Sequence, residues 1–175
     1  MPGHQTKYVH ITDRTYLRPR DIIQFSNEVL KQYKQRAKNG VDEQKFINQD
    51  INYARQDYSN YFYEELDDEI HKHIPEYKQY FEIFKTIGKV QFDRTDYIVA
   101  FNKRHELFPD ISDPIIILKS LFDFSVIGFY KAGGLGYGGS EYIFKYIDRK
   151  AQFDSSADRF RVHLGLMEVL NLKRY

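Results

Sequence analysis

The sequence comes nearest to a chemical motif in one octapeptide, residues 133–140, which reads Gly-Gly-Leu-Gly-Tyr-Gly-Gly-Ser. Its spacing fits the GxGxxG pattern of dinucleotide sites, and it also fits a P-loop except that Gly139 stands where the phosphate-binding lysine belongs. Phosphate binding at such loops needs a helix N-terminus directly after the glycines. Residues 141–147 instead alternate with a period of two and are rich in aromatic and β-branched residues, which predicts a strand. The octapeptide is therefore predicted to form the tip of a β-hairpin and not a nucleotide site.

The acidic end of a long predicted helix is the second arrangement that could support chemistry. Asp67 and His71 are four residues apart and share one helical face, as two ligands of a divalent metal ion would. His73 faces another side of an unbroken helix, and sites for first-row metals usually take a further ligand from a second element. An uncharacterised metal-dependent enzyme is kept as an alternative, but we predict no metal site and no catalytic residue in this chain.

Two long helices are predicted in the first half of the chain. Apolar residues recur at helical spacing over residues 19–38, and Pro19 is suited to the first turn of that helix. A second apolar pattern runs from a cap at Asp42 almost to Pro75. It predicts either one long helix or a helix broken near Ser59.

From residue 75 onward the predicted elements are short. Their order is helix, short strand, helix, helix, strand, glycine loop and strand, which is the order of a winged helix with the octapeptide as its wing. The predicted fold class is mainly α with a small β-hairpin wing. The predicted helices cover residues 76–87, 93–104 and 115–124, the strands cover 90–92, 126–131, 141–147 and 160–163, and a final helical turn covers 164–170.

Three regions follow from these elements. Residues 1–9 are polar and are expected to be disordered or left from cloning. Residues 10–74 are expected to form a helical segment, and residues 75–175 a winged-helix domain. With 42% hydrophobic residues the chain can build a core for such a fold.

Composition narrows the classes of protein to which the chain can belong. It has no cysteine, which excludes disulfides and thiolate zinc sites, and it has no apolar run near 18 residues. We therefore expect a cytoplasmic protein with no membrane partner. The net charge is +1, but residues 1–40 carry eight basic and three acidic side chains, and residues 41–75 carry three and nine. This asymmetry predicts that the two long helices complement each other in charge.

Two stretches of the sequence resemble parts of P-loop ATPases. Residues 16–25, with the run Arg18-Pro19-Arg20, resemble the segment that opens the lid helix in AAA+ and STAND-type ATPases, in which a winged helix often follows the lid. Residues 124–130, 140–146 and 160–166 are similar to the C-terminal part of large bacterial P-loop ATPases of defence or DNA-linked systems. Together the two resemblances cover roughly residues 10 to 172.

The resemblance implies a role for two arginines. In the family, the second arginine of the lid motif touches the γ-phosphate of the nucleotide, which assigns a sensor-like role to Arg20 with Arg18 as its neighbour. The chain departs from the family because it has no complete Walker A or Walker B motif. ATP and Mg²⁺ are therefore expected only in a parent protein, and no cofactor is expected in this chain.

These observations lead to one principal hypothesis and one main alternative. The chain is predicted to be a non-catalytic interaction or regulatory module, the C-terminal part of a bacterial P-loop ATPase system. Its partner would be another protein or the ATPase core of the same system. The alternative is a winged-helix protein that binds DNA. The residues predicted to contact DNA or a protein partner are Lys119, Lys131, Tyr137, Lys145, Arg149 and Lys150.

Overall fold

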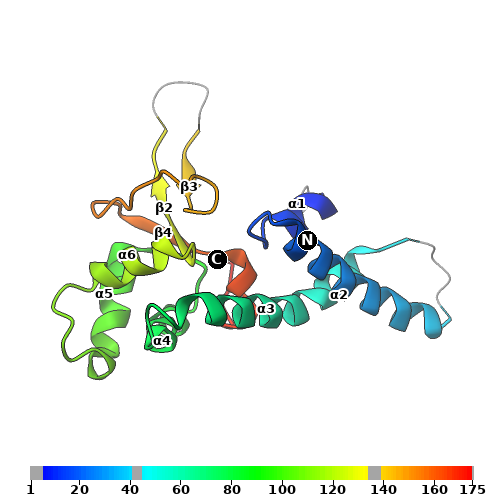
Figure 1. Ribbon diagram of the computed structural model, residues 1–175, viewed down its shortest axis with the longest axis horizontal. Helices are drawn as coiled ribbons and strands as arrows, with labels where there is room; N and C mark the ends of the chain where they lie inside the picture. The colour runs from blue at the N-terminus through cyan, green and yellow to red at the C-terminus, as the bar shows by residue number, and fades with distance from the viewer. Residues whose placement is uncertain (1–5, 41–44, 134–138, 175) are drawn as a thin grey trace. The chain divides into compact units, whose positions relative to one another are not determined.

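The computed structural model describes residues 6–40, 45–133 and 139–174 (Figure 1). These residues are mainly α-helical with a four-stranded antiparallel sheet, which confirms the predicted fold class. The chain divides into two units, Met1–Asp67 with Leu164–Val169, and Asp68–His163 with Leu170–Tyr175. This division lies seven residues before the predicted boundary at 74, and it includes a return of the chain to the first unit that the sequence did not indicate.

The first unit is built on two antiparallel helices, α2 (Pro19–Lys38) and α3 (Asn48–Ile70) (Figure 1). The bounds of α2 are those predicted, and Pro19 occupies its first turn. The two helices bury aromatic side chains against each other, with the ring centroids of Phe25 and Tyr58 4.5 Å apart. Tyr58 is fully buried, and this burial raises the pKa of its hydroxyl well above the usual value. The second predicted helix begins later than expected, and its expected cap, Asp42, lies outside the described residues.

A short helix, α1 (Lys7–Thr12), precedes these two and was not predicted. Residues 7–9 therefore differ from the expectation of disorder. The Thr6 hydroxyl caps this helix by accepting a hydrogen bond from the Val9 N–H at 3.2 Å. His10 and Thr12 are buried. Six residues are too few to show a helical period, so burial by the rest of the unit stabilises a helix that the pattern alone does not reveal.

Residues 164–169 complete the first unit, and Ser59 is the residue that holds them. Its hydroxyl donates to the Gly165 carbonyl at 2.7 Å and accepts from the Val169 N–H at 3.0 Å. The Glu168 carboxylate lies 3.5 Å from the Arg14 guanidinium, which is almost fully buried, and 3.4 Å from that of Arg55. Helix α3 continues through Ser59, so the predicted alternative of a break there is wrong.

Three helices of the second unit cover one face of its sheet. They are α4 (Tyr77–Ile87), α5 (Arg94–Lys103) and α6 (Ile115–Asp123), and a 3-10 turn, η1 (His105–Leu107), follows α5. Gly88 ends α4 with a φ of 72°, a conformation that glycine adopts without strain. Each of these helices lies within one or two residues of its predicted position.

The sheet of the second unit has the strand order β1-β4-β2-β3. Its strands are β1 (Gln91–Asp93), β2 (Ile127–Lys131), β3 (Glu141–Ile143) and β4 (Arg159–Val162). Strands β2 and β3 pair antiparallel, which confirms the predicted hairpin, while residues 134–138 of its glycine-rich tip lie outside the described residues. The later strand β4, and not β3, lies between β1 and β2.

Strand β3 is shorter than the predicted 141–147 because the chain turns after Ile143. The carbonyl of Phe144 accepts hydrogen bonds from the N–H groups of Ile147 and Asp148 at 3.2 and 3.1 Å. The helix that a phosphate-binding loop would need after the glycines is thus replaced by a strand and a turn, as expected.

The two faces of the sheet differ in character because side chains alternate along each strand. Phe92, Phe129 and Phe160 are buried on the inner face, and their partners in register are one another or other apolar residues. The helices supply the facing rings, with Phe84 5.6 Å from Phe92 and Phe122 5.5 Å from Phe129. The opposite parity places Gly128, Tyr130, Arg159 and Arg161 on the outer face.

Gly128 lets an aromatic ring approach the backbone closely on the outer face. A Cβ atom at this position would lie 2.7 Å from the Ile143 carbonyl oxygen and 2.7 Å from two ring atoms of Phe144. We expect Gly128→Ala to lower the free energy of unfolding by about 1–3 kcal/mol, because a buried ring and a backbone carbonyl must both move. Urea unfolding measures the change. Gly139→Ala is the matched control, since a Cβ there meets nothing within 4 Å, and an equal loss in both variants would contradict the prediction.

Ser59 gives a second prediction. Replacing it with alanine leaves the Gly165 carbonyl and the Val169 N–H without the hydroxyl that pairs with both, at a buried position. We expect Ser59→Ala to cost about 1–3 kcal/mol in the same measurement. Ser26→Ala is the control, because the Ser26 hydroxyl bonds only within its own helix, to the Ile22 carbonyl. A loss no larger than that of the control would show that the segment is held by other contacts.

Candidate functional site

The two arginines of the lid-like motif lie at the start of α2, as predicted. Arg18 is the N-cap residue, and its guanidinium lies 5.0 Å from the centre of the Tyr16 ring. Arg20 forms an ion pair with Glu65 of α3 and lies 3.6 Å from Asp21. The pairing of Arg20 with the acidic part of α3 is the charge complementarity that the composition predicted.

The residue before these arginines has a strained backbone. Leu17 has a φ of 57°, in the left-handed region that leucine rarely adopts, and its side chain is 52% exposed. Neighbouring contacts hold this conformation, because the Asp21 carboxylate accepts from the Tyr16 N–H at 3.3 Å and the Thr15 hydroxyl accepts from the Leu17 N–H at 3.2 Å. The turn thus presents an apolar side chain to solvent directly beside Arg18.

The basic residues predicted to contact DNA or a protein partner do not form one cluster of contacts. Lys145 points inward, where its ammonium donates to the Ala151 carbonyl at 2.7 Å and lies 6.0 Å from the Phe122 ring. Lys119 is exposed on α6, and Ile117, Leu118, Leu121 and Phe122 of the same helix are buried. Lys131, Arg149 and Lys150 are also exposed, and Tyr137 lies outside the described residues.

The structure does not assemble a metal site around Asp67 and the two histidines after it. Across residues 6–40, 45–133 and 139–174 no three His, Asp or Glu side chains come together in a way that could hold an ion. His73 packs instead against the Phe124 ring, with centroids 5.5 Å apart. Within the same ranges, no helix has both the length and the apolar character needed to cross a membrane.

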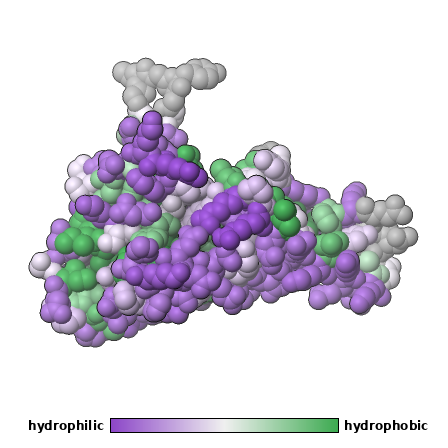
Figure 2. All heavy atoms as spheres, in the orientation of Figure 1, coloured by the Kyte–Doolittle hydropathy of each residue, from purple (hydrophilic) through white to green (hydrophobic). Residues whose placement is uncertain are grey.

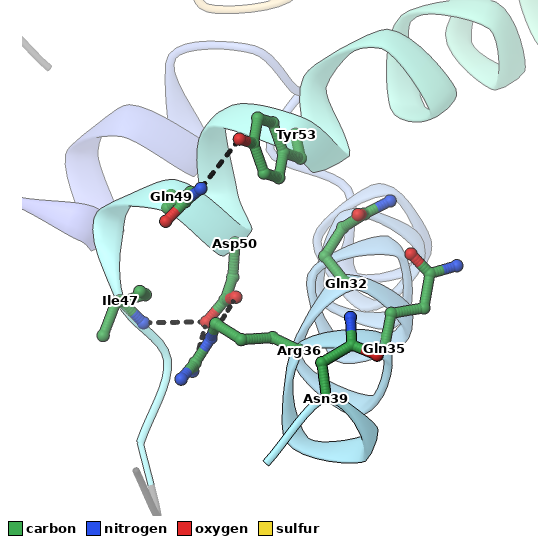
Figure 3. Close-up of a pocket in the computed structure, with 8 residues that line it drawn as sticks. All are labelled: Gln32, Gln35, Arg36, Asn39, Ile47, Gln49, Asp50 and Tyr53. Atoms are coloured by element: carbon green, nitrogen blue, oxygen red, sulfur yellow. Dashed lines mark hydrogen bonds and ion pairs between the residues drawn. The ribbon is translucent and has the colours of Figure 1, made fainter. Parts of the chain in front are cut away.

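A pocket of about 390 Å³ opens between the end of α2 and the start of α3 (Figure 3). Arg36 and Asp50 are the charged residues among those that line it, and they neutralise each other through two hydrogen bonds of 2.9 Å. The other polar groups are carboxamides and the Tyr53 hydroxyl, which accepts from Gln49 at 2.7 Å. Such a lining suits a neutral polar group and not a phosphate. The full lining is Gln32, Gln35, Arg36, Asn39, Ile47, Gln49, Asp50 and Tyr53.

The ion pair at this pocket also lowers the pKa of its carboxylate, Asp50. The hydrogen bonds from Arg36 hold the pKa of Asp50 below its usual value, with help from the Ile47 N–H, which donates at 2.9 Å, and against the opposing effect of burial. The Asp50 side chain is 2% exposed and that of Arg36 is 13% exposed. The pair is therefore a structural clamp between α2 and α3 as well as one wall of the pocket.

The outer face of the sheet carries a continuous stack of arginines and aromatic rings that sequence reasoning missed. The Arg161 guanidinium lies 5.3 Å from the Phe144 ring and 4.8 Å from the Tyr142 ring. Tyr142 meets Tyr130 edge to face at 5.4 Å, and the Arg159 guanidinium lies 3.8 Å from the centre of the Tyr130 ring. We call Tyr130, Tyr142, Arg159 and Arg161 the arginine–tyrosine ladder.

The pKa values of the two ladder tyrosines are shifted in opposite directions. A hydrogen bond with Ser140, together with the nearby positive charge of Arg159, lowers the pKa of Tyr130. Burial raises the pKa of Tyr142, although both arginines act against that change. The alternation Arg159-Phe160-Arg161-Val162 in the sequence indicates a strand with one cationic face. Which tyrosines these arginines contact depends on the strand order, which the alternation does not reveal.

Asp50 provides a stability prediction with a defined pH dependence. A lowered folded-state pKa contributes stability above the unfolded value of about 3.9 and loses it as the pH falls through the folded value. We expect Asp50→Asn to cost about 2–4 kcal/mol at neutral pH, since it leaves a largely buried guanidinium without its carboxylate. The difference from the wild type should shrink as the pH falls below 3.9, which urea unfolding at several pH values measures.

Asp68→Asn is the control, because Asp68 is an exposed carboxylate on the same helix, and it should change stability by less than about 0.5 kcal/mol. A cost for Asp50→Asn that does not vary with pH would show that the carboxylate charge is not the stabilising feature.

Comparison with known proteins adds a finding for the first unit. Residues 3–67 match the family model of the FunZ-associated C-terminal helical domain. The match ends at Asp67, which is also where the structure places the end of the continuous part of the first unit. No curated protein and no solved structure matches the chain. The helices that carry the Arg18 and Arg20 turn and the clamped pocket are thus similar to a domain defined as the C-terminal helical part that accompanies FunZ.

Proposed function

We propose that the chain is a non-catalytic interaction module that docks onto the ATPase core of a bacterial P-loop system and regulates it. The observation that carries this proposal is the strained turn at Leu17. A leucine in the left-handed region costs about 1–2 kcal/mol, and such strain persists where the surroundings hold it and is concentrated at functional sites. Here the strain exposes an apolar side chain beside two arginines, and arginine is enriched at the centres of docking sites.

The arginine contacts fit a docking role. Arg20 is 54% exposed at its side chain, and its ion pair with Glu65 is therefore screened by water and worth at most about 1 kcal/mol. A phosphate or carboxylate of a partner can replace Glu65 at little cost. The start of α2 thus offers a cation that is positioned by the fold but is available for exchange, as a sensor-like arginine requires.

The match of residues 3–67 to a C-terminal helical domain supports an accessory role, because a C-terminal domain is one part of a larger protein. The element order of residues 75–175 supports a further part of the proposal, that a winged helix follows the helical unit along the chain. In that arrangement β1, β4 and β2 form the small sheet, and the connection that begins after β2 corresponds to the wing.

The proposal requires a Walker-motif protein in the same reading frame or operon, and the test uses that protein. The purified chain alone should not hydrolyse ATP, and it should co-elute with the Walker-motif protein and change its rate of phosphate release. We expect Leu17→Gly to relieve backbone strain and raise the free energy of unfolding by about 1 kcal/mol. The same variant should weaken docking at least about tenfold, because it removes the side chain that the partner buries.

Arg20→Ala should preserve folding and reduce the regulatory effect on ATP turnover. Lys34→Ala is the matched control, since Lys34 is an exposed cation on the same helix, and it should behave as the wild type. ATP hydrolysis by the chain alone would overturn the proposal. Unchanged docking by both Leu17→Gly and Arg20→Ala would overturn the assignment of the surface.

A further inference from the structure

We propose that the outer face of the sheet binds single-stranded nucleic acid, and that the arginine–tyrosine ladder is its binding surface. All four ladder residues lie within Asp68–His163, and none of them belongs to the surface assigned to docking above. This inference goes beyond the proposed function and can fail without affecting it, because its measurement is affinity for an oligonucleotide.

The contacts within the ladder hold the planar guanidinium groups and the tyrosine rings in fixed positions, on which bases can stack. Strand register places Tyr130 directly opposite Tyr142, and β4 brings Arg159 and Arg161 to the same face two residues apart. At 3.8 Å from its centre, the Arg159 guanidinium lies against the Tyr130 ring. The rings hold the arginines in place, so little side-chain entropy remains to be lost when a ligand binds.

The chemistry of these groups matches a single strand. Unpaired bases stack on aromatic rings and on guanidinium planes, and each such contact contributes about 1–3 kcal/mol. The edges of a guanidinium donate hydrogen bonds to phosphate oxygens while its plane stacks. Bases in a duplex are already stacked on one another and cannot use such a surface. The ladder therefore favours single-stranded over duplex nucleic acid.

The charges on this face are positive but few. They are those of Arg159 and Arg161, and Asp93, the register partner of Arg159, opposes them. In Figure 2 the surface at the base of the grey loop, where Figure 1 shows β2 and β3, is mostly hydrophilic. Binding is thus expected to depend mainly on stacking, with two phosphate contacts and a shallow salt dependence.

The test is fluorescence anisotropy of the full chain with a labelled oligothymidylate and with a duplex of equal length, over a salt series. We expect the single strand to bind more tightly, with a slope of log affinity against log salt near −1.4, from about −0.7 for each of two contacts. The double variant Arg159→Gln with Arg161→Gln should bind at least about tenfold more weakly. Arg159→Lys should weaken binding but keep the slope, because it retains the charge and loses the plane.

Lys103→Gln is the control for loss of a surface cation outside the ladder, since Lys103 is exposed on α5, and it should bind as the wild type. Melting curves check that each variant folds. If the double variant does not fold, Arg159→Lys carries the test, because Arg159 is exposed and its replacement should not disturb the core. Equal or tighter binding of the duplex, no binding of the single strand at low salt, or full affinity in the folded variants would each overturn the inference.

Discussion

The fold of the first unit depends on one buried hydroxyl. Ser59 lies in the middle of α3, yet it uses both its donor and its acceptor on backbone groups more than 100 residues later. A buried hydroxyl that bonds two backbone groups specifies one position of that segment, since any shift along the helix breaks both hydrogen bonds. Glu168 lies 3.5 Å from the buried Arg14 guanidinium and so balances its charge. The helical part that matches the family model is therefore completed by a segment outside the match.

In the second unit the corresponding constraint is strand register. A shift of one residue would move Phe160 from the core to the surface and Arg161 into the core, so the aromatic inner face and the cationic outer face are fixed together. Gly128 is part of the same constraint. Because it has no side chain, Phe144 can lie on the outer face and support Arg161, and the ladder begins from that contact.

Sequence patterns predicted the elements better than their contacts. Helix α2 and the β2–β3 hairpin follow from local periods, and both are found where they were predicted. Other features depend on burial and on partners distant in sequence, so local patterns do not predict them. They are the helix α1, the end of β3 at Ile143 and the return of residues 164–169 to the first unit. The same difference applies to the sites. Arg18 and Arg20 were identified from a local motif. The ladder instead requires β4 to lie beside β2, and the sequence of a single strand does not predict the strand order.

Two ion pairs join α2 to α3, and they differ in how readily they separate. One stabilises the helical pair, and the other can exchange one of its partners for a ligand group. Arg36 and Asp50 are shielded from water, so their separation would leave buried charges and would weaken the fold. Arg20 and Glu65 are more exposed, and water replaces either partner at small cost. A partner that binds at the start of α2 can therefore take Arg20 from Glu65 while the opposite end of the helical pair stays clamped. Docking at this surface then requires rearrangement of one exposed side chain, and the strained turn at Leu17 can remain as the fold holds it.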